Sequence, residues 1–369
     1  MRDNTSLFTN IDQYLKPAVG KGQFFCAGYP FDDNFRWSLF MNMREAAIHQ
    51  WLGDCSYSGF NLEVASADAS FRQYWRMTHQ KDSYIVMDAP PEKESCDAFI
   101  HVDELLRQAG LSAPEILEQD LQQGFLLLTD FGCQDYLGQL NPDSENKLYS
   151  DAIQALLQMQ TRIATDELPG YGEPLLNREM DLFHGWFLGE LLDIRLTDHQ
   201  SNLWQSAKKT LIANALQQPE VFVHRDFHSR NLMKIQSGNP AILDFQDAVK
   251  GPLTYDLVSL LRDCYIEWPV QRVESLAKEY YKLAREKNLL DVSHEKFIYW
   301  FNLMGIQRHL KAVGIFSRLN IRDGKPGYLK DIPRTLNYVI SVGREESSMS
   351  KLVSLMDELD IENRILRLL

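Results

Sequence analysis

Residues 221–231 read VFVHRDFHSRN, and residues 241–247 read AILDFQD. Each stretch begins with an apolar run of strand character, and the turn sequence SGNP lies between them. The pattern predicts a strand that carries Asp226 into a tight loop, followed by a hairpin that returns Asp244 alongside Asn231. Two carboxylates and one carboxamide are therefore expected at one edge of a small β structure.

These three side chains suit phosphoryl transfer. Asn231 and Asp244 offer the oxygen ligands that Mg²⁺ prefers, and this metal bridges the phosphates of a nucleotide. Asp226 can orient a substrate hydroxyl and accept its proton while the new bond forms. Because the reaction passes through a loose transition state, positioning and charge neutralisation suffice and no covalent nucleophile is required. The residues predict an ATP-dependent enzyme with Mg²⁺ as its metal.

A metal hydrolase is the competing hypothesis for the same stretch. His224, Asp226 and His228 alternate, so on a strand they would face one way and could form a zinc or two-metal site. No second cluster of His and Asp lies nearby to complete the coordination, and this hypothesis leaves Asn231 and Asp244 without a role. We expect His224 instead to brace the backbone of the loop.

Around this stretch the sequence predicts two lobes in an α+β fold. Alternating and apolar patterns predict a three-stranded meander within residues 61–91, a helix near 96–109 and further strands near 116–118 and 125–129. The rest of the chain is mainly helical outside the hairpin. Apolar residues recur at helical spacing near 149–163, 180–191, 268–287 and 293–318.

The expected organisation has three parts. Residues 1–42 are polar and show no sustained period, so we treat them as an extension of unassigned role. A helix is expected to open near Met41 and to begin the small β-rich N-lobe, residues 43–131. Residues 132–369 form the larger, mainly helical C-lobe, which contains the catalytic hairpin, the metal site and the acceptor pocket.

Composition excludes several classes of protein. The 369 residues include 38 Lys plus Arg and 51 Asp plus Glu, a net charge of −13 that argues against a nucleic-acid binder. A hydrophobic content of 44% excludes a mainly disordered chain. The five cysteines form no C-x-x-C pair, and no apolar run is long enough to span a bilayer. We expect a cytoplasmic protein with a small-molecule substrate and no membrane partner, of unknown oligomeric state.

The catalytic stretch resembles a known family. The spacing H-R-D-x-x-x-x-N, followed by a strand-terminal Asp, is similar to that of the kinase-like phosphotransferases, which include aminoglycoside phosphotransferases and choline kinases. The segment GPLTYDL at 251–257 extends the likeness, which covers about residues 43 to 345. The resemblance implies a bilobal protein-kinase-like fold with ATP between the lobes. It also implies a lobe connector whose backbone contacts adenine, formed by Leu128, Thr129, Asp130 and Phe131.

Three further strings narrow the resemblance. SADASFRQY at 66–74, VMDAPPE at 86–92 and GIQRHLK at 305–311 are similar to bacterial anomeric sugar kinases. That resemblance implies phosphorylation of N-acetylmuramate and N-acetylglucosamine at C1, as in cell-wall recycling. Two alternatives stay open: a kinase for another hydroxylated small molecule such as an aminoglycoside or choline, and a nucleotide-binding module without catalysis.

The chain departs from the kinase pattern where the phosphates of ATP are held. In place of a G-x-G-x-x-G loop it has small residues, whose backbone N–H groups can approach a phosphate: Ser66, Ala67, Asp68, Ala69 and Ser70. Met87 and Asp88 stand where a strand Lys is expected. Arg72, Arg76 or Lys93 can supply the missing charge, and the sequence does not choose among them.

Residues that bind the acceptor are predicted from the helices that flank the hairpin. Glu179, Asp181 and Trp186 precede the catalytic loop, where Trp can stack on a sugar ring and carboxylates can bind its hydroxyls, although most of this aromatic stripe is expected in the core. His228 lies within the loop. Arg308, with His309 and Lys311, forms a basic cluster that suits a lactyl carboxylate, or else is simply a solvated helix face.

Overall fold

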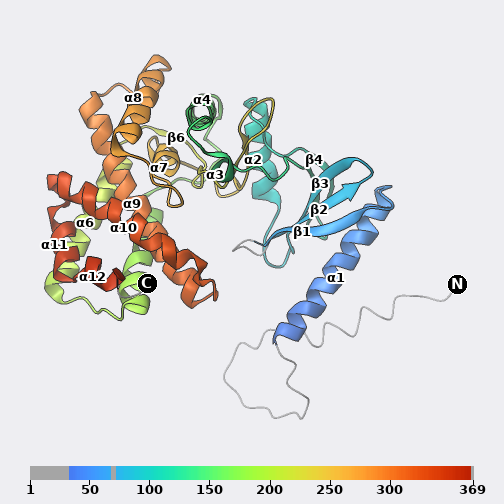
Figure 1. Cartoon of the computed structure of the whole chain (residues 1–369), viewed down its shortest axis with the longest axis horizontal. Helices are drawn as coiled ribbons and strands as arrows, with labels where there is room; N and C mark the ends of the chain where they lie inside the picture. The colour runs from blue at the N-terminus through green and yellow to red at the C-terminus, as the bar shows by residue number, and fades with distance from the viewer. Residues whose placement is uncertain (1–32, 68–71, 367–369) are drawn as a thin grey trace, which may run out of the picture. The chain divides into compact units, whose positions relative to one another are not determined.

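The computed structural model describes residues 33–67 and 72–366, and its chain divides into two compact units, residues 1–51 and 52–369 (Figure 1). The predicted loop residues Asp68, Ala69 and Ser70 lie outside the described residues, as do the side chains of Ser66 and Ala67. The predicted boundaries between the extension, the N-lobe and the C-lobe stay a prediction.

Helix α1, Asp33–Asp54, begins upstream of the start that we expected at Met41. No Gly or Pro occurs between residues 31 and 41, so nothing in the sequence interrupts the helix there. The segment contains apolar residues such as Phe35, Trp37 and Leu39, and our prediction wrongly grouped it with the polar residues that precede it. The first unit ends within α1, at Trp51.

The smaller lobe is a five-stranded sheet in the order β1-β2-β3-β5-β4, with every neighbouring pair antiparallel. The predicted meander at its start is confirmed. The strands are β1 Asn61–Ala67, β2 Gln73–His79, β3 Asp82–Asp88, β4 Ile116–Asp120 and β5 Phe125–Thr129. Helix α2, Asp97–Gln108, buries Phe99, Val102 and Leu106, which recur at helical spacing.

Strand β5 leads from this sheet into the second lobe. Its first four residues are a continuous apolar run and all are buried, as expected for a strand covered on both faces. It pairs with β3 on one side and β4 on the other. The chain leaves β5 at Thr129 and enters the predicted connector.

The larger lobe is mainly helical, as predicted. Its helices and helical turns are α3 Tyr136–Gln139, α4 Glu145–Arg162, α5 Glu173–Leu182, η1 Phe183–Leu191, α6 Asp198–Leu216, α7 Tyr255–Leu261, α8 Val270–Glu286, α9 His294–Ile321, η2 Pro326–Asp331, α10 Ile332–Glu345, η3 Ser347–Met349, α11 Ser350–Glu358 and α12 Ile361–Leu366. The apolar spacing of the sequence predicted helix in the regions of α4, α5 with η1, α8 and α9.

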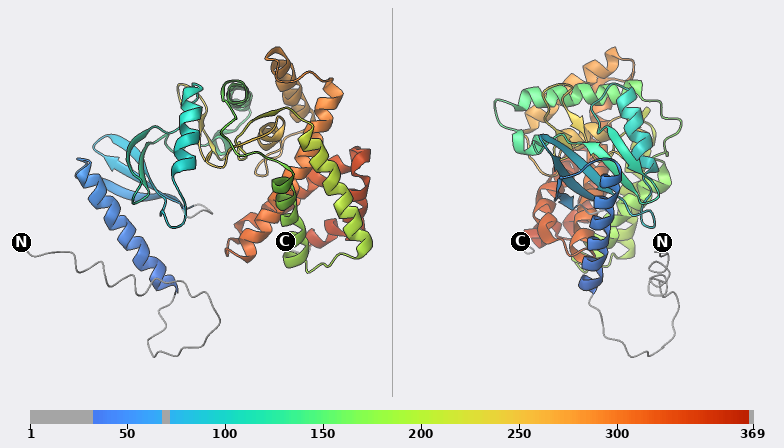
Figure 2. Two further views of the ribbon diagram at one scale, coloured as in Figure 1. Left: turned by 180° about the vertical axis from the view of Figure 1, so that it is seen from behind. Right: turned by 90° about the vertical axis from the view of Figure 1, so that its right-hand side faces the viewer.

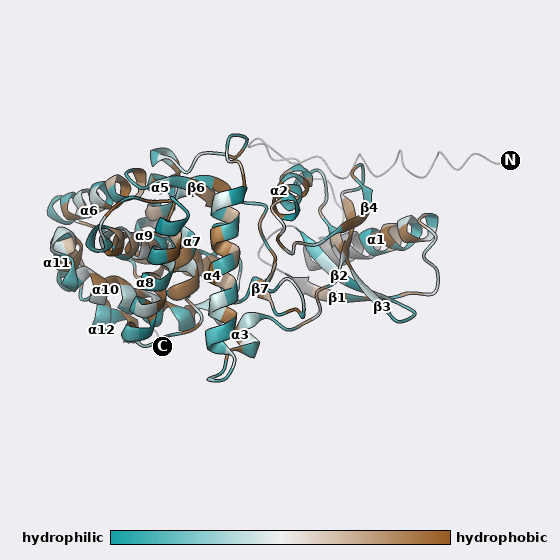
Figure 3. Ribbon diagram, turned by 90° about the horizontal axis from the view of Figure 1, so that it is seen from above, coloured by the Kyte–Doolittle hydropathy of each residue, from teal (hydrophilic) through white to brown (hydrophobic). Residues whose placement is uncertain are grey.

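Helix α9 is the centre of this lobe. It contacts α5, α6, α7, α8 and α10 (Figure 2). Most of its residues are buried, including charged ones. The outer helix α4 is amphipathic, and brown apolar residues recur along it among polar ones (Figure 3). None of the helices within the described residues is both long and apolar enough to cross a bilayer.

Two short antiparallel pairs interrupt the helices. Strand β6, Glu220–Val223, pairs with β9, Val249–Pro252, and β7, Leu232–Met233, pairs with β8, Ala241–Ile242. The sequence predicted β6, β7 and β8, the last two slightly longer, but not β9, which contains Gly and Pro. The loop at 224–231 is consequently held at both ends, by β6 and by β7. The predicted two-lobed α+β fold is confirmed.

Candidate active site

The loop after β6 is fixed by a buried carboxylate. Asp256, in the first turn of α7, accepts hydrogen bonds from the backbone N–H of His224 (2.6 Å) and from that of Arg225 (3.0 Å). Arg225 has a φ of 78°, a left-handed conformation that a residue with a side chain adopts at a cost. The two bonds to Asp256 hold this sharp turn in place, and the turn aims the next residue, Asp226.

His224 braces the same loop. It is fully buried, and its Nδ1 accepts a hydrogen bond from the backbone N–H of Asp226 (3.3 Å). Burial lowers the pKa of His224 to about 4, so the ring is neutral at pH 7 and can act as this acceptor.

His224, Asp226 and His228 do not face one way, as the metal-hydrolase hypothesis requires. Residues 224–230 form a loop rather than a strand, so His224 points into the core while His228 lines a cavity. No group of three or more His, Cys, Asp and Glu side chains that could hold a metal ion occurs within residues 33–67 and 72–366. The strand premise is wrong because Asp256 and the positive φ of Arg225 bend the chain immediately after Val223.

Asp226, Asn231 and Asp244 lie together, as the hairpin predicts. The amide nitrogen of Asn231 donates to the carbonyl oxygen of Asp226 (3.0 Å) and to Oδ2 of Asp244 (3.2 Å). The backbone N–H of Leu243 donates to the carbonyl oxygen of Asn231 (2.9 Å), which aligns the two arms of the hairpin. Asp244 has a φ of 63°, and its Oδ1 accepts from Gln246 (2.9 Å).

These residues form the wall between two cavities. The C-lobe cavity, about 250 Å³, is lined only by residues of the larger lobe, among them Asp226. The interlobe cavity, about 450 Å³, is lined by residues of both lobes. Arg230, Asn231 and Asp244 line both. Ligands bound in the two cavities would therefore come together at this wall.

The interlobe cavity contains the predicted connector. Leu128, Thr129, Asp130 and Phe131 all line it. The carboxylate of Asp130 is engaged by Arg76 of β2 (Nε to Oδ2, 2.7 Å) and by the hydroxyl of Ser83 (2.5 Å). That leaves the connector backbone and the apolar side chains to meet a ligand. Apolar and aromatic side chains line the cavity from both lobes: Tyr74, Ile85, Phe99, Leu243 and Phe245.

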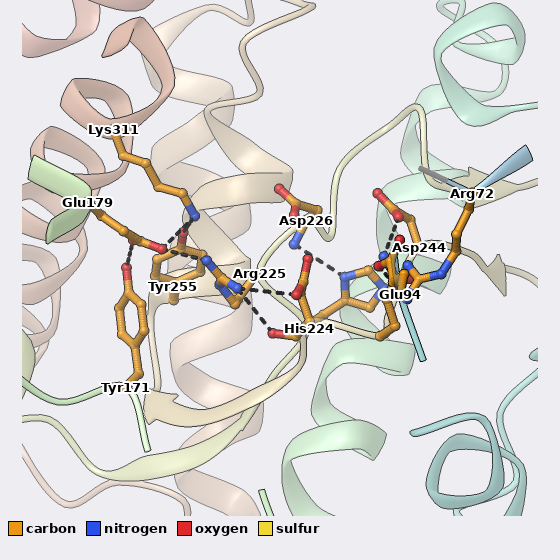
Figure 4. A network of polar contacts seen from close by, with 12 residues as sticks. Arg72, Glu94, Tyr171, Glu179, His224, Arg225, Asp226, Asp244, Tyr255 and Lys311 are labelled. Carbon is orange, nitrogen blue, oxygen red and sulfur yellow. Dashed lines mark hydrogen bonds and ion pairs between the residues drawn. The ribbon is translucent and has the colours of Figure 1, made fainter. Parts of the chain in front are cut away.

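The structure separates the candidates for the phosphate-anchoring cation. Arg72 is 3% exposed, forms an ion pair with Glu94 (2.7 Å) and does not line the interlobe cavity, and neither does Lys93 (Figure 4). Arg76 lines that cavity but is paired with Asp130. The ion pair with Glu94 fixes one end of the Arg72 guanidinium, and the nucleotide contact of Arg72 stays a prediction.

Arg230 is a candidate that the sequence analysis missed. Its guanidinium carbon lies 3.7 Å from the centre of the Tyr265 ring, and within the described part of the chain it forms no ion pair or hydrogen bond. Of the three residues shared by the two cavities, it is the cation. The signal was in the motif itself, since Arg230 directly precedes Asn231.

Glu179 is not among the residues that line the C-lobe cavity, where we predicted a contact with the acceptor. It is 4% exposed and accepts from Arg225 Nη2 (2.5 Å), from Lys311 Nζ (3.1 Å) and from the hydroxyl of Tyr171 (Figure 4). The pKa of Glu179 is lowered: burial alone would raise it, but the charges of Lys311 and Arg225 outweigh burial. Glu179 ties α5 and α9 to the catalytic loop.

Asp181 and Trp186 do not lie at the acceptor position that we predicted for them. Asp181 forms an ion pair with Lys208 of α6 (2.5 Å), and Trp186 is partly buried in η1. Neither lines the C-lobe cavity, because α5 and η1 turn Met180, Phe183 and Phe187 into the core and leave these two on other faces.

The basic cluster on α9 is buried, so a solvated helix face is ruled out. Arg308 and Lys311 line the C-lobe cavity together with His228. His309 points elsewhere: its Nε2 lies 2.8 Å from the carbonyl oxygen of Arg262, and its ring stacks on Tyr338 at 4.9 Å. The cluster thus divides into two residues at the cavity and one in the core.

The burial of His309 predicts acid sensitivity of the fold. Burial lowers the pKa of His309 to about 3, whereas an exposed His titrates near 6.5. The unfolded chain therefore binds the extra proton as the pH falls below about 6.5, and stability is lost on the way to pH 3. At pH 5 this one group costs about 2 kcal/mol relative to pH 7.5.

Urea unfolding at pH 7.5 and 5.0 measures this loss. We expect His309→Gln to lose about 2 kcal/mol less than the unsubstituted protein between the two pH values, because Gln does not titrate. An identical loss in both proteins would contradict the assignment of a neutral, buried His309.

The electrostatic environment keeps Asp226 ionised. Burial alone would raise the pKa of this carboxylate, but the charges of Lys311, Arg308 and Arg225 hold the pKa below its ordinary value. An ionised carboxylate at the cavity wall can accept a hydrogen bond, and then a proton, from a ligand hydroxyl.

Asn231 and Asp244 fit a divalent cation. Both hydrogen bonds of the Asn231 side chain use its amide nitrogen, so Oδ1 remains unbonded within the described residues. This oxygen and the carboxylate of Asp244 belong to the wall shared by both cavities. Oxygen donors of this kind suit Mg²⁺.

A small antiparallel sheet, a helical lobe and a carboxylate–carboxamide–carboxylate wall between two cavities define a two-lobed phosphotransferase. Residues 61–288 match the phosphotransferase enzyme family, and the chain belongs to that family. It is a kinase that acts on a hydroxyl group, and the family implies ATP as the phosphoryl donor.

The sequence is similar to two N-acetylmuramate/N-acetylglucosamine kinases. The protein from Pseudomonas putida is 44% identical over 81% of this chain and 88% of its own length. That from Pseudomonas aeruginosa is 43% identical with the same coverage. Among solved structures, choline kinase LicA from Streptococcus pneumoniae matches 80% of this chain and 99% of its own, with 16% identity and a TM-score of 0.57, which shows a shared fold.

Proposed function

We propose that this protein transfers the γ-phosphoryl group of ATP to the anomeric hydroxyl of N-acetylmuramate and N-acetylglucosamine, a step suited to the reuse of cell-wall sugars. The observation that carries the proposal is the wall that Asn231 and Asp244 form between two cavities, with Asp226 on its C-lobe side. The choice of sugar is supported by the names of relatives 43–44% identical over most of the chain.

The interlobe cavity is the proposed site of ATP. Its apolar side chains suit the adenine ring, and the connector backbone at Leu128 to Phe131 offers hydrogen-bonding groups along the ring edge. The triphosphate would then extend toward Asn231 and Asp244. These two residues would hold Mg²⁺, which when bound neutralises the charge of the phosphates.

The C-lobe cavity is the proposed site of the sugar. Asp226 accepts the proton of the C1 hydroxyl as that oxygen forms its bond to the γ-phosphorus. The bond from the γ-phosphorus to the bridging oxygen breaks, and ADP leaves with that oxygen. Because Asp226 is already ionised, it needs no prior deprotonation at neutral pH.

An acceptor screen tests this function. The protein, ATP and Mg²⁺ should release ADP with either sugar, and the product should gain one phosphate that is labile in acid. Anomeric phosphates cleave readily because they leave through an oxocarbenium-like path. Nucleotide binding without turnover on any sugar would favour a non-catalytic module, and an acid-stable product would place the phosphate on another hydroxyl.

Arg230 is proposed to neutralise charge on the phosphoryl group in transfer, since it lines both cavities and lacks a protein counter-ion in the described residues. We expect Arg230→Gln to lower kcat about 10²-fold, the usual cost of removing one transition-state donor, with a small change in the KM of the sugar. Steady-state kinetics measures both constants.

Lys234→Gln is the matched control for Arg230. Lys234 is a cation of the same hairpin that lines neither cavity, so its removal should leave kcat within about twofold of the unsubstituted value. A kcat for Arg230→Gln equal to that of the control would contradict the role given to Arg230.

A further inference from the structure

Arg308 is a buried cation without an adequate partner among the residues that the structure describes. Its side chain is 6% exposed, its Nη1 lies 3.9 Å from the sulfur of Cys264, and its Nε has no hydrogen-bond partner. A thiol is a weak acceptor, and a buried guanidinium that lacks an anion is costly. The missing partner is best supplied by an anionic ligand.

The nearby carboxylates do not fill this role. Asp226 and Asp263 lie close enough to interact electrostatically with Arg308, but neither forms an ion pair with it in the described chain. Asp263 accepts instead from Ser229 and from the backbone N–H of Tyr265. Asp263 therefore holds the catalytic loop in place, and Asp226 is the proposed base on that loop.

Of the three cations that line the C-lobe cavity, Arg308 is the one best placed for an anion on the acceptor. Lys311 is paired with Glu179 (3.1 Å) and donates to the hydroxyl of Tyr255 (2.9 Å). Arg230 is stacked on Tyr265 and lies at the wall shared with the interlobe cavity. Arg308 lines the C-lobe cavity but not the interlobe cavity, so it belongs to the acceptor side.

Helix α9 presents Arg308 beside an apolar surface. Ala312, Ile315 and Leu319 follow Arg308 at intervals of three or four residues, so one face of the helix lines the cavity. Phe316 lines it as well. A substituent that combines a carboxylate with a methyl group would meet a charged end and an apolar wall.

We propose that Arg308 binds the lactyl carboxylate that N-acetylmuramate carries and N-acetylglucosamine lacks, and so sets the preference of the enzyme between the two sugars. This inference rests on the proposed function. The planar guanidinium can make two parallel hydrogen bonds to a carboxylate, a geometry that Lys does not reproduce. Asp226 and Arg308 line the same cavity, so a sugar with C1 at Asp226 would place its C3 substituent in the cavity that Arg308 lines.

The test compares kcat/KM for both sugars in the unsubstituted protein, Arg308→Gln and Arg308→Lys. We expect Arg308→Gln to reduce kcat/KM for N-acetylmuramate about 10- to 100-fold more than that for N-acetylglucosamine, the range for a hydrogen bond to a charged group. Arg308→Lys should lie between the two. Retained turnover of N-acetylglucosamine shows that each variant is folded.

The methyl ester of N-acetylmuramate separates the effect of the negative charge from that of the size of the lactyl substituent, because it keeps the group but removes its charge. The unsubstituted protein should prefer the acid to the ester, and Arg308→Gln should use the two equally. Arg334→Gln is the matched control: Arg334 donates to the carbonyl oxygen of Cys264 (2.7 Å) but does not line the cavity, so it should not alter the ratio between sugars.

Three outcomes separate this inference from the proposed function. Equal losses for both sugars in Arg308→Gln, or an unsubstituted protein that phosphorylates N-acetylglucosamine but not N-acetylmuramate, would overturn the role of Arg308 and leave the kinase intact. An unsubstituted protein that phosphorylates neither sugar would overturn both.

Discussion

Replacing Asp226 by Asn is expected to lower kcat about 10³-fold with either sugar, within the range usual for loss of a general base. The side chain keeps its shape but can no longer accept the proton of the hydroxyl. The fold of the loop should persist, because Asn231 donates to the backbone carbonyl of Asp226 and not to its carboxylate. The affinity for ATP should change by no more than a few-fold.

ADP release in a coupled assay and nucleotide binding by calorimetry measure the two quantities. Asp247→Asn is the control, since Asp247 follows the metal-binding position, has a largely exposed side chain and lines neither cavity. It should retain activity within about twofold, as surface carboxylates usually do. If Asp226→Asn kept more than a tenth of the activity, Asp226 would not be the base.

Replacing Glu179 by Ala is expected to lower the free energy of unfolding by about 3–5 kcal/mol, the cost of breaking a buried ion pair from one side. Arg225 and Lys311 both lose their carboxylate, and both are mostly buried. Because Arg225 directly precedes Asp226, activity should fall too. Glu179→Gln keeps the shape and part of the hydrogen bonding and should be less destabilising.

Denaturant unfolding measures this effect, and Glu173→Ala supplies its control on the same helix. Glu173 is exposed in the first turn of α5 and forms no ion pair within the described residues, so its loss should cost less than about 1 kcal/mol. Equal losses from Glu179→Ala and Glu173→Ala would contradict the structural role of Glu179.

The catalytic hairpin could be predicted because its information is local. Turn residues and apolar runs fix which residues return beside each other, so Asp226, Asn231 and Asp244 followed from spacing alone. Strand β9 could not be predicted in the same way. Gly251 and Pro252 weaken any strand signal, and the pairing with β6 depends on a distant segment.

The acceptor candidates show where sequence spacing stops being sufficient. Whether Glu179 faces a cavity or a buried cation depends on how α5, α9 and the loop pack, which no local pattern records. The α9 cluster is a similar case: its sequence suited a solvated face, yet the structure buries Arg308, His309 and Lys311 and separates their surroundings. Arg230 is a different case. Its position beside Asn231 was evident from the sequence, but its proposed role depends on the two cavities that it lines.

The position of the phosphate on the product shows whether the C1 hydroxyl is the acceptor. After reaction of N-acetylmuramate with ATP and Mg²⁺, a phosphorus–proton correlation spectrum should link the new phosphate to the anomeric proton of the sugar. A correlation to the protons on C6, or no phosphorylated sugar under conditions where ATP binds, would contradict transfer from the interlobe cavity to a C1 hydroxyl held at Asp226.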